Sequence, residues 1–172
     1  DNWYAHYQLG LLYFEREDYL NALKEFESSV KKRKNAWALH GAASVYVLQQ
    51  EEGKAISAIR RGMMMQKENL SYLKEGMRIL SICGGFEDIL DLYAEIGNSC
   101  REDGRIRLYY IQALDKIGLV QKAYELLCGE GGLVVDDVRE GESAVGELWK
   151  EIQRDLFGTE PEIPYRFDFR SV

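Results

Sequence analysis

The sequence contains few side chains of the types that act as nucleophiles or bind soft metals. Its two histidines, His6 and His40, have no Ser–His–Asp or Cys–His spacing to link them to a catalytic group. Cys83, Cys100 and Cys128 form an odd-numbered set without a CxxC pair, which indicates buried, reduced thiols rather than a disulfide framework or a zinc site. We therefore predict no nucleophilic catalysis and no cofactor. Reduced thiols favour a cytoplasmic location, although the sequence specifies no compartment.

Four carboxylates gather near the C-terminal end, at Asp136, Asp137, Glu140 and Glu142. Converging carboxylates can bind a hard cation or act as an acid–base pair. The spacing of a Ca²⁺ loop with its central glycine is absent here. We interpret the stretch as a solvated loop whose negative charge favours the N-terminus of the next helix, and we keep an enzyme that uses this cluster as an alternative.

Two further stretches resemble ligand-binding motifs only in part. The basic run KKRK at residues 31–34 is typical of a nuclear address or a nucleic-acid patch, but it falls at the expected end of a helix, where cations favourably face the helix dipole. The glycine-rich CGEGGL has no preceding strand and no following GK[ST], so a phosphate loop is not indicated. The net charge is −7, which disfavours binding to nucleic acid.

The elements that position these residues are predicted to be helices. Only two prolines occur among 172 residues, hydrophobic residues make up 46%, and no run of alternating β-branched residues suggests a strand. No apolar stretch reaches the roughly 18 residues of a membrane span, so we expect no membrane association. Helices are predicted at about 3–15, 19–33, 36–49, 53–66, 69–83, 86–97, 105–117, 120–128 and 143–157.

A fixed period runs through the first three quarters of the chain. Small or aliphatic residues that suit a close helix–helix contact occur at Ala22, Ala55, Ile89 and Ala123, in steps of 33, 34 and 34. A period near 34 is typical of two-helix repeats, none of which can bury its apolar face alone. We therefore expect four helical hairpins to stack over residues 1–128.

The first copy carries Leu9, Gly10, Tyr13, Ala22 and Phe26 in register, and in this it resembles the tetratricopeptide repeat. The resemblance implies an all-α, right-handed superhelix of four hairpins, whose inner groove binds a protein segment. It places these residues in the groove: Tyr4, Tyr7, Trp37, His40, Lys74, Arg78, Arg105 and Gln112. The groove would be aromatic at one end and basic at the other. An alternative is that a preceding domain buries some of the aromatic residues.

The last 44 residues depart from the repeat. We predict a glycine-rich, acidic loop at 129–142, an amphipathic helix at 143–158 that caps the stack, and an extended tail at 159–172. Ser143 is expected to be the N-cap of this helix. Phe167 and Phe169 alternate with charged residues, which favours a short strand in the tail.

The segments DVREGE, LWKEI and PYRFDFR resemble the closing part of an uncharacterised bacterial family, in which a β-rich, sugar-enzyme-like front half precedes tetratricopeptide repeats. The chain begins at Asp1, so we expect it to be a fragment of a longer protein. The first hypothesis is a non-enzymatic module that binds a protein segment of another chain. The alternative is an intramolecular scaffold that packs on a carbohydrate-active domain of its own chain. In that role it would also join two copies of the protein into a homodimer.

Overall fold

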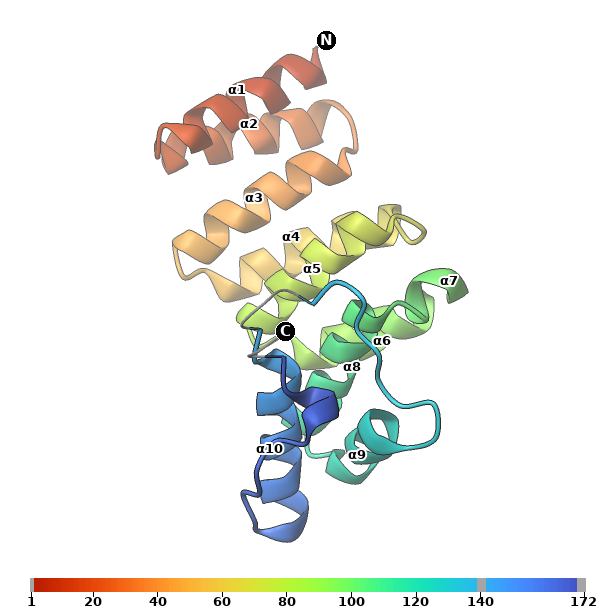
Figure 1. Ribbon diagram of the computed structural model, residues 1–172. Coiled ribbons are helices and arrows are strands. Elements are labelled where there is room, and N and C mark those ends of the chain that lie inside the picture. Colours follow the sequence, from red (N-terminus) through yellow and green to blue (C-terminus); the bar gives the residue numbers. More distant parts are fainter. Residues whose placement is uncertain (1, 139–141, 170–172) are drawn as a thin grey trace. The chain divides into compact units, whose positions relative to one another are not determined.

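The chain is all-α, as predicted, in a computed structural model that describes residues 2–138 and 142–169 (Figure 1). It forms two compact units, residues 1–100 and residues 101–172. Within the described residues there is no β-strand, only an isolated antiparallel bridge between Glu142 and Phe169. The helices of the first unit are α1 (Trp3–Glu15), α2 (Tyr19–Lys32), α3 (Ala36–Leu48), α4 (Glu52–Met65), α5 (Leu70–Ile82) and α6 (Phe86–Glu95).

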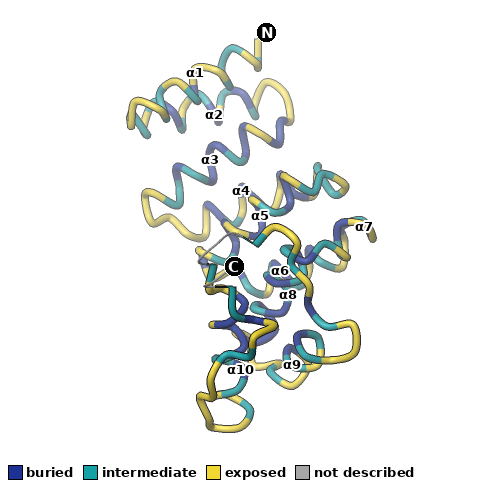
Figure 2. The backbone as a smooth tube through the Cα atoms, viewed as in Figure 1, coloured by how far each residue is buried: buried dark blue, intermediate teal, exposed yellow. Residues whose placement is uncertain are grey.

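The 1–100 unit is a stack of three helical hairpins, α1–α2, α3–α4 and α5–α6. The first helix of each hairpin contacts both helices of the hairpin before it: α3 contacts α1 and α2, and α5 contacts α3 and α4. Helix α3 is accordingly buried along most of its length (Figure 2). The short helix α7 (Asn98–Arg101) lies at the boundary between the units and was not predicted.

The turn inside each hairpin has the same backbone geometry, and a fourth copy occurs in the second unit. Glu17, Gln50, Gly84 and Gly118 have φ between 58° and 85°, in sequence steps of 33, 34 and 34. In every copy the next residue donates its N–H to a carbonyl five residues earlier: Asp18 to Tyr13, Glu51 to Tyr46, Gly85 to Leu80, and Leu119 to Leu114. This is the Schellman ending of a helix, repeated at the predicted period.

The start of each hairpin repeats in the same way. The side chains of Asn2, Asn35, Asn69 and Asp103 accept hydrogen bonds from backbone N–H groups of the helix that follows. These N-caps are again 33, 34 and 34 residues apart. A side-chain acceptor at this position satisfies a helix N–H that otherwise has no partner. The chain is therefore helical-repeat-like in its hairpin starts as well as in its turns.

Exchanging glycine and glutamine between two of the turns should change stability in opposite directions. Gln50 has φ of 58° and Gly84 has φ of 71°, and a Cβ at residue 84 would meet nothing within 4 Å. Because a non-glycine residue in this region costs roughly 1 kcal/mol, Gln50→Gly should raise the free energy of unfolding by about 0.5 to 1 kcal/mol and Gly84→Gln should lower it by a similar amount. Urea titration followed by circular dichroism measures both; a change of the same sign in the two variants would contradict the assignment.

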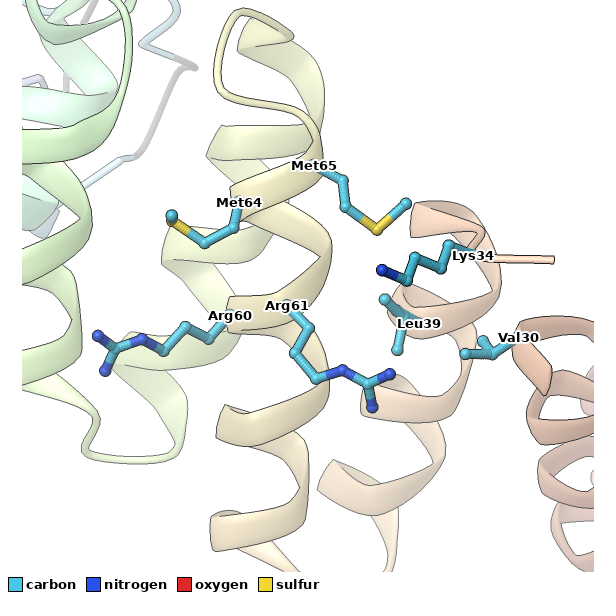
Figure 3. Close-up of a pocket in the computed structure, with 7 residues that line it drawn as sticks. All are labelled: Val30, Lys34, Leu39, Arg60, Arg61, Met64 and Met65. Carbon is cyan, nitrogen blue, oxygen red and sulfur yellow. The ribbon is translucent and has the colours of Figure 1, made fainter.

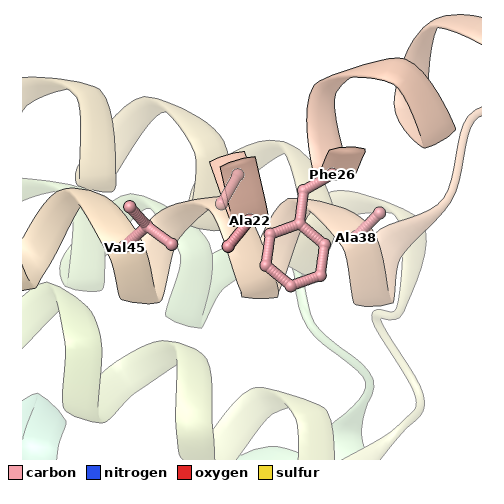
Figure 4. Close-up of a cluster of buried hydrophobic side chains, with 5 residues drawn as sticks. Ala22, Phe26, Ala38 and Val45 are labelled. Atoms are coloured by element: carbon pink, nitrogen blue, oxygen red, sulfur yellow. The ribbon is translucent and has the colours of Figure 1, made fainter. Parts of the chain in front are cut away.

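The core of the first two hairpins centres on Phe26, which is fully buried on α2 (Figure 4). Its ring lies between two glycines of other helices. A Cβ at Gly10 of α1 would stand 2.6 Å from Phe26 Cδ1, and a Cβ at Gly41 of α3 would stand 2.6 Å from Phe26 Cζ. Both distances are below van der Waals contact, so these two positions require glycine while the ring is present.

The 101–172 unit contains the fourth hairpin and the predicted terminal helix. Its elements are α8 (Gly104–Lys116), α9 (Val120–Cys128), α10 (Ala144–Phe157) and the 3₁₀ turn η1 (Tyr165–Phe167). Helix α10 contacts α8, α9 and η1. Phe167 is 3% exposed and packs against Trp149 of α10. The tail therefore forms a 3₁₀ turn where a strand was predicted, because the Phe167 ring is anchored to α10.

Two details of this unit differ from the sequence predictions. Ser143 does occupy the N-cap position of α10, but its side chain makes no capping hydrogen bond. The fourth hairpin was grouped with residues 1–128, whereas in the structure it belongs to the same compact unit as α10. The loop expected at 129–142 packs closely on α8: a Cβ at Gly104 would stand 1.9 Å from the carbonyl oxygen of Val134.

One carboxylate in the core of the second unit has an unsatisfied oxygen. Asp115 of α8 is 5% exposed, and its Oδ1 has no hydrogen-bond partner among the described residues. Burial raises the pKa of Asp115 from 3.8 to about 6, the Asp155 and Glu151 carboxylates raise it too, and Lys116 opposes them. Lys116 itself donates a hydrogen bond to Glu151 at 2.8 Å.

Candidate functional site

An aromatic surface runs across the first helices of the three hairpins in the 1–100 unit. We call it the aromatic face; its residues are Tyr4 and Tyr7 of α1, Trp37 and His40 of α3, and Tyr72 of α5. Residues three apart lie on one side of a helix, which explains why Tyr4 pairs with Tyr7 and Trp37 with His40. Ring centroids are 6.4 Å apart in the first pair and 6.3 Å in the second.

Tyr72 connects the face to the core beneath it. Its ring centroid lies 5.1 Å from that of Trp37 and 6.1 Å from that of His40. Its hydroxyl donates a hydrogen bond to the carbonyl oxygen of Ala36 at 2.6 Å. Burial raises the pKa of Tyr72, and Tyr7 adds to the increase. The ring of Tyr72 thereby joins the α3 and α5 parts of the aromatic face.

The exposed part of the aromatic face consists mainly of Tyr4 and Trp37. Tyr4 is 54% exposed and Trp37 is 44% exposed, whereas Tyr72 is fully buried; Tyr7 and His40 are half-buried. An indole with almost half its surface in water gains free energy when a partner covers it. The face thus has a buried floor and two accessible rings.

His40 holds an unused hydrogen-bonding atom beneath this surface. Its Nε2 is buried and has no hydrogen-bond partner among the described residues, and the Glu75 carboxylate is 3.9 Å away. Burial lowers the pKa of His40; the Glu75 carboxylate opposes the decrease and Arg78 adds to it. The imidazole is therefore neutral at neutral pH, and its Nε2 is an unsatisfied polar atom beneath the aromatic face.

The basic end of the predicted groove is partly neutralised. Arg78 is exposed, but its guanidinium forms an ion pair at 3.1 Å with Glu75, the carboxylate that also lies near His40. Lys74 is half-buried on the same helix. A carboxylate that approached Arg78 would compete with Glu75, so this end is better suited to a polar group than to a strongly acidic one.

Arg105 and Gln112 belong to the 101–172 unit, on α8. The guanidinium of Arg105 is already engaged: Nε donates to Asp137 at 3.0 Å and a terminal nitrogen donates to Glu142 at 2.9 Å. The hydrogen bond to Glu142 is the main cause of a raised pKa at Arg105. Two carboxylates of the acidic cluster thus hold the loop on α8; Glu140 lies outside the described residues.

The remaining candidates form no metal or thiol site. His6 Nδ1 lies 2.6 Å from Glu25, and the three cysteines are free. Over residues 2–138 and 142–169, no three His, Cys, Asp or Glu side chains are arranged to hold a metal ion. In the same residues, no helix combines the length and the apolar character that crossing a bilayer demands.

Tyr72 is not among the residues that the sequence placed on this face. On the repeat register Tyr72 corresponds to Ala38, a core position, and both residues are fully buried. The long ring of Tyr72 starts in the core and extends to Trp37. A register fixes the direction of a Cβ but not how far a side chain extends from it.

The hairpins and the aromatic face define a helical-repeat-like, all-α protein with an exposed aromatic surface. No protein-family model, curated protein or solved structure matches the chain significantly.

Proposed function

We propose that the chain is a non-enzymatic interaction module of the tetratricopeptide-like kind, which binds a segment of a protein partner on the aromatic face. The observation that carries this proposal is the exposure of Trp37 and Tyr4 beside buried Tyr72. The two accessible rings lie on the first helices of hairpins that stack directly on one another. A bound segment would cover the two rings.

The residues that should matter most are Trp37 and Arg78. Replacing both with alanine removes the largest exposed ring and the exposed cation near it, and neither side chain is buried in the core. Binding of a segment selected from a random peptide library against the unmodified protein should weaken at least about tenfold. Isothermal titration calorimetry measures the loss, and circular dichroism should show unchanged helicity.

A matched control exists on another face of the same unit. Leu20 and Lys24 of α2 are also an exposed apolar residue and an exposed cation, and Leu20 is 76% exposed. The variant Leu20→Ala/Lys24→Ala should bind the selected segment as the unmodified protein does. Loss of binding in this control together with retention in the Trp37/Arg78 variant would place the binding surface elsewhere.

The second candidate function is an intramolecular scaffold, in which α1 packs on another domain of the same polypeptide. It is favoured by the exposed apolar side of α1, where Leu9 is 43% exposed and Leu12 is 40% exposed. Hydrogen exchange of α1 in the parent polypeptide and in this chain alone distinguishes the two functions. Slower exchange of α1 in the parent supports the scaffold; equal exchange leaves the aromatic face as the binding surface.

A further inference from the structure

A second hollow surface lies on the other side of α3. Trp37 and Leu39 are two residues apart and so point about 200° away from each other around the helix axis. Leu39 lies at a cavity of about 350 Å³ between α2, α3 and α4, which is also lined by Val30, Lys34, Arg60, Arg61, Met64 and Met65 (Figure 3). An adjoining cavity of about 250 Å³ shares Val30, Leu39 and Arg61. We call the two together the α2–α4 groove.

The lining of the groove is apolar and adaptable. Leu39 is 4% exposed and forms part of the floor, while Met64 and Met65 are 42% and 43% exposed. Methionine side chains are flexible and polarisable, and they adjust to apolar groups of different shape. Adjacent exposed methionines beside a cavity of this size are suited to taking up a large apolar side chain.

The rim of the groove is positively charged. Lys34 and Arg61 line the first cavity, and Lys31 lines the second. Across the described part of the chain, none of these three cations has a hydrogen-bond or ion-pair partner. Arg60, by contrast, points away from Lys34 (Figure 3) and pairs with Asp88 and Asp91 of α6. An acid that lines the second cavity, Glu27, accepts a hydrogen bond from Tyr46 at 2.8 Å.

We propose that the α2–α4 groove binds an acidic peptide segment of a partner protein. A leucine or phenylalanine of the segment enters the cavity against Leu39, Met64 and Met65, and flanking Asp or Glu side chains pair with Lys34 and Arg61. Charge complementarity identifies the occupant: three cations that have no partner among the described residues surround this apolar hollow, in a protein whose net charge is −7. The proposal is independent of the aromatic face, because it concerns the opposite side of α3.

A nucleic acid fits this groove less well than an acidic peptide. Phosphate groups would pair with the three cations, but the sugar–phosphate backbone offers nothing apolar to fill the cavity between them. Stacking of bases needs exposed aromatic rings. The first cavity is lined by methionine, valine, leucine and cationic side chains, and Tyr46, which lines the second, is half-buried with its hydroxyl bonded to Glu27. An acidic peptide satisfies both the cations and the methionines.

The test uses the full chain and the synthetic peptide acetyl-EDLLEDLFE-amide. We expect binding detectable by calorimetry, and we expect the ε-methyl NMR signals of Met64 and Met65 to shift while that of buried Met77 does not. Arg61→Glu should weaken binding at least about tenfold. The control Lys24→Glu makes the same charge change at an exposed position of α2 outside both cavities and should leave binding unchanged.

Three further measurements make the proposal falsifiable. The peptide with its leucines and phenylalanine replaced by serine should not bind, and Met65→Ser should weaken binding of the original peptide. The absence of binding at ~1 mM, equal binding of the serine peptide, or full binding to Arg61→Glu would overturn the proposal. A single-stranded DNA oligonucleotide that binds more tightly than the peptide and displaces it would overturn it in favour of a nucleic-acid site.

Discussion

Gly41→Ala is expected to lower the free energy of unfolding of the 1–100 unit by about 2 kcal/mol. The new Cβ would stand 2.6 Å from Phe26 Cζ, and the ring cannot retreat because Gly10 packs at a matching distance on its Cδ1 edge. Forcing an extra methyl group into such a contact costs about 3 kcal/mol, and the higher helix propensity of alanine offsets about 1 kcal/mol of this cost.

The clash with the Phe26 ring can be distinguished from the general effect of replacing a glycine in a helix. A Cβ at Gly53 of α4 meets nothing within 4 Å, so Gly53→Ala should leave stability unchanged or raise it slightly. Phe26→Leu removes the ring edge that the methyl group added by Gly41→Ala would strike, so the two changes combined should cost less than their sum. Urea titration followed by circular dichroism measures the unmodified chain and the four variants. If the loss in free energy of unfolding of Gly41→Ala/Phe26→Leu equalled the sum of the two single losses, the Phe26 ring would not be the cause of the destabilisation.

Asp115→Asn is expected to stabilise the 101–172 unit at pH 8 by about 1 to 2 kcal/mol. The pKa of Asp115 rises from 3.8 to about 6 on folding, so the folded state binds this proton more tightly than the unfolded state. Stability contributed by the protonated carboxyl is present near pH 4 and is lost as the pH rises through about 6. The full increase in the pKa of Asp115 corresponds to about 3 kcal/mol of unfolding free energy. Solvent screens the charges of the neighbouring Asp155 and Glu151, so we expect a smaller effect.

This prediction is checked by comparing the two proteins at equal pH. Hydrogen exchange of α8 amides should be slower in Asp115→Asn than in the unmodified chain at pH 8, and nearly equal at pH 4.5. Asp136→Asn removes the same charge from an exposed position of the same unit and should have no comparable effect. If the benefit of Asp115→Asn were the same at both pH values, protonation of Asp115 would not be its cause.

His40 should give the first unit the opposite dependence. Burial lowers its pKa below 6.5, so the unfolded state binds the proton more tightly and stability is lost as the pH falls below about 6.5. Acidification should therefore weaken the 1–100 unit through His40 and strengthen the 101–172 unit through Asp115.

The helices were predictable because their signals are local and periodic. All nine predicted helices are found within two residues of their expected bounds, since apolar spacing and the turn residues act within each hairpin. Helix α7 has only four residues and is too short to show a period. The 3₁₀ turn at Tyr165–Phe167 depends on the contact between Phe167 and Trp149, which no local pattern in the tail specifies.

The binding surfaces were less predictable because some of their contacts join residues that are distant in the sequence. The repeat register placed Tyr4 beside Tyr7 and Trp37 beside His40, because the two residues of each pair are three apart on one helix. The partners of Arg105 come from 32 and 37 residues further along the chain, across a loop, and this separation has no sequence signature. The α2–α4 groove was missed because the KKRK run was explained by the dipole of α2, although Lys34 lies beyond the end of that helix at Lys32.

The position of Phe26 between two glycines affects how hairpins of this kind can be recombined. The ring fills a space in its own hairpin, at Gly10, and another in the next hairpin, at Gly41. A chimera joined in the loop at Asn35 would separate Phe26 from its second glycine and bring it against whatever residue the donor sequence supplies. Crossovers after Gly41, inside α3, keep the three residues together. The segment that can be exchanged with its packing intact is thus a hairpin plus half of the following helix, and not the hairpin that the sequence period outlines.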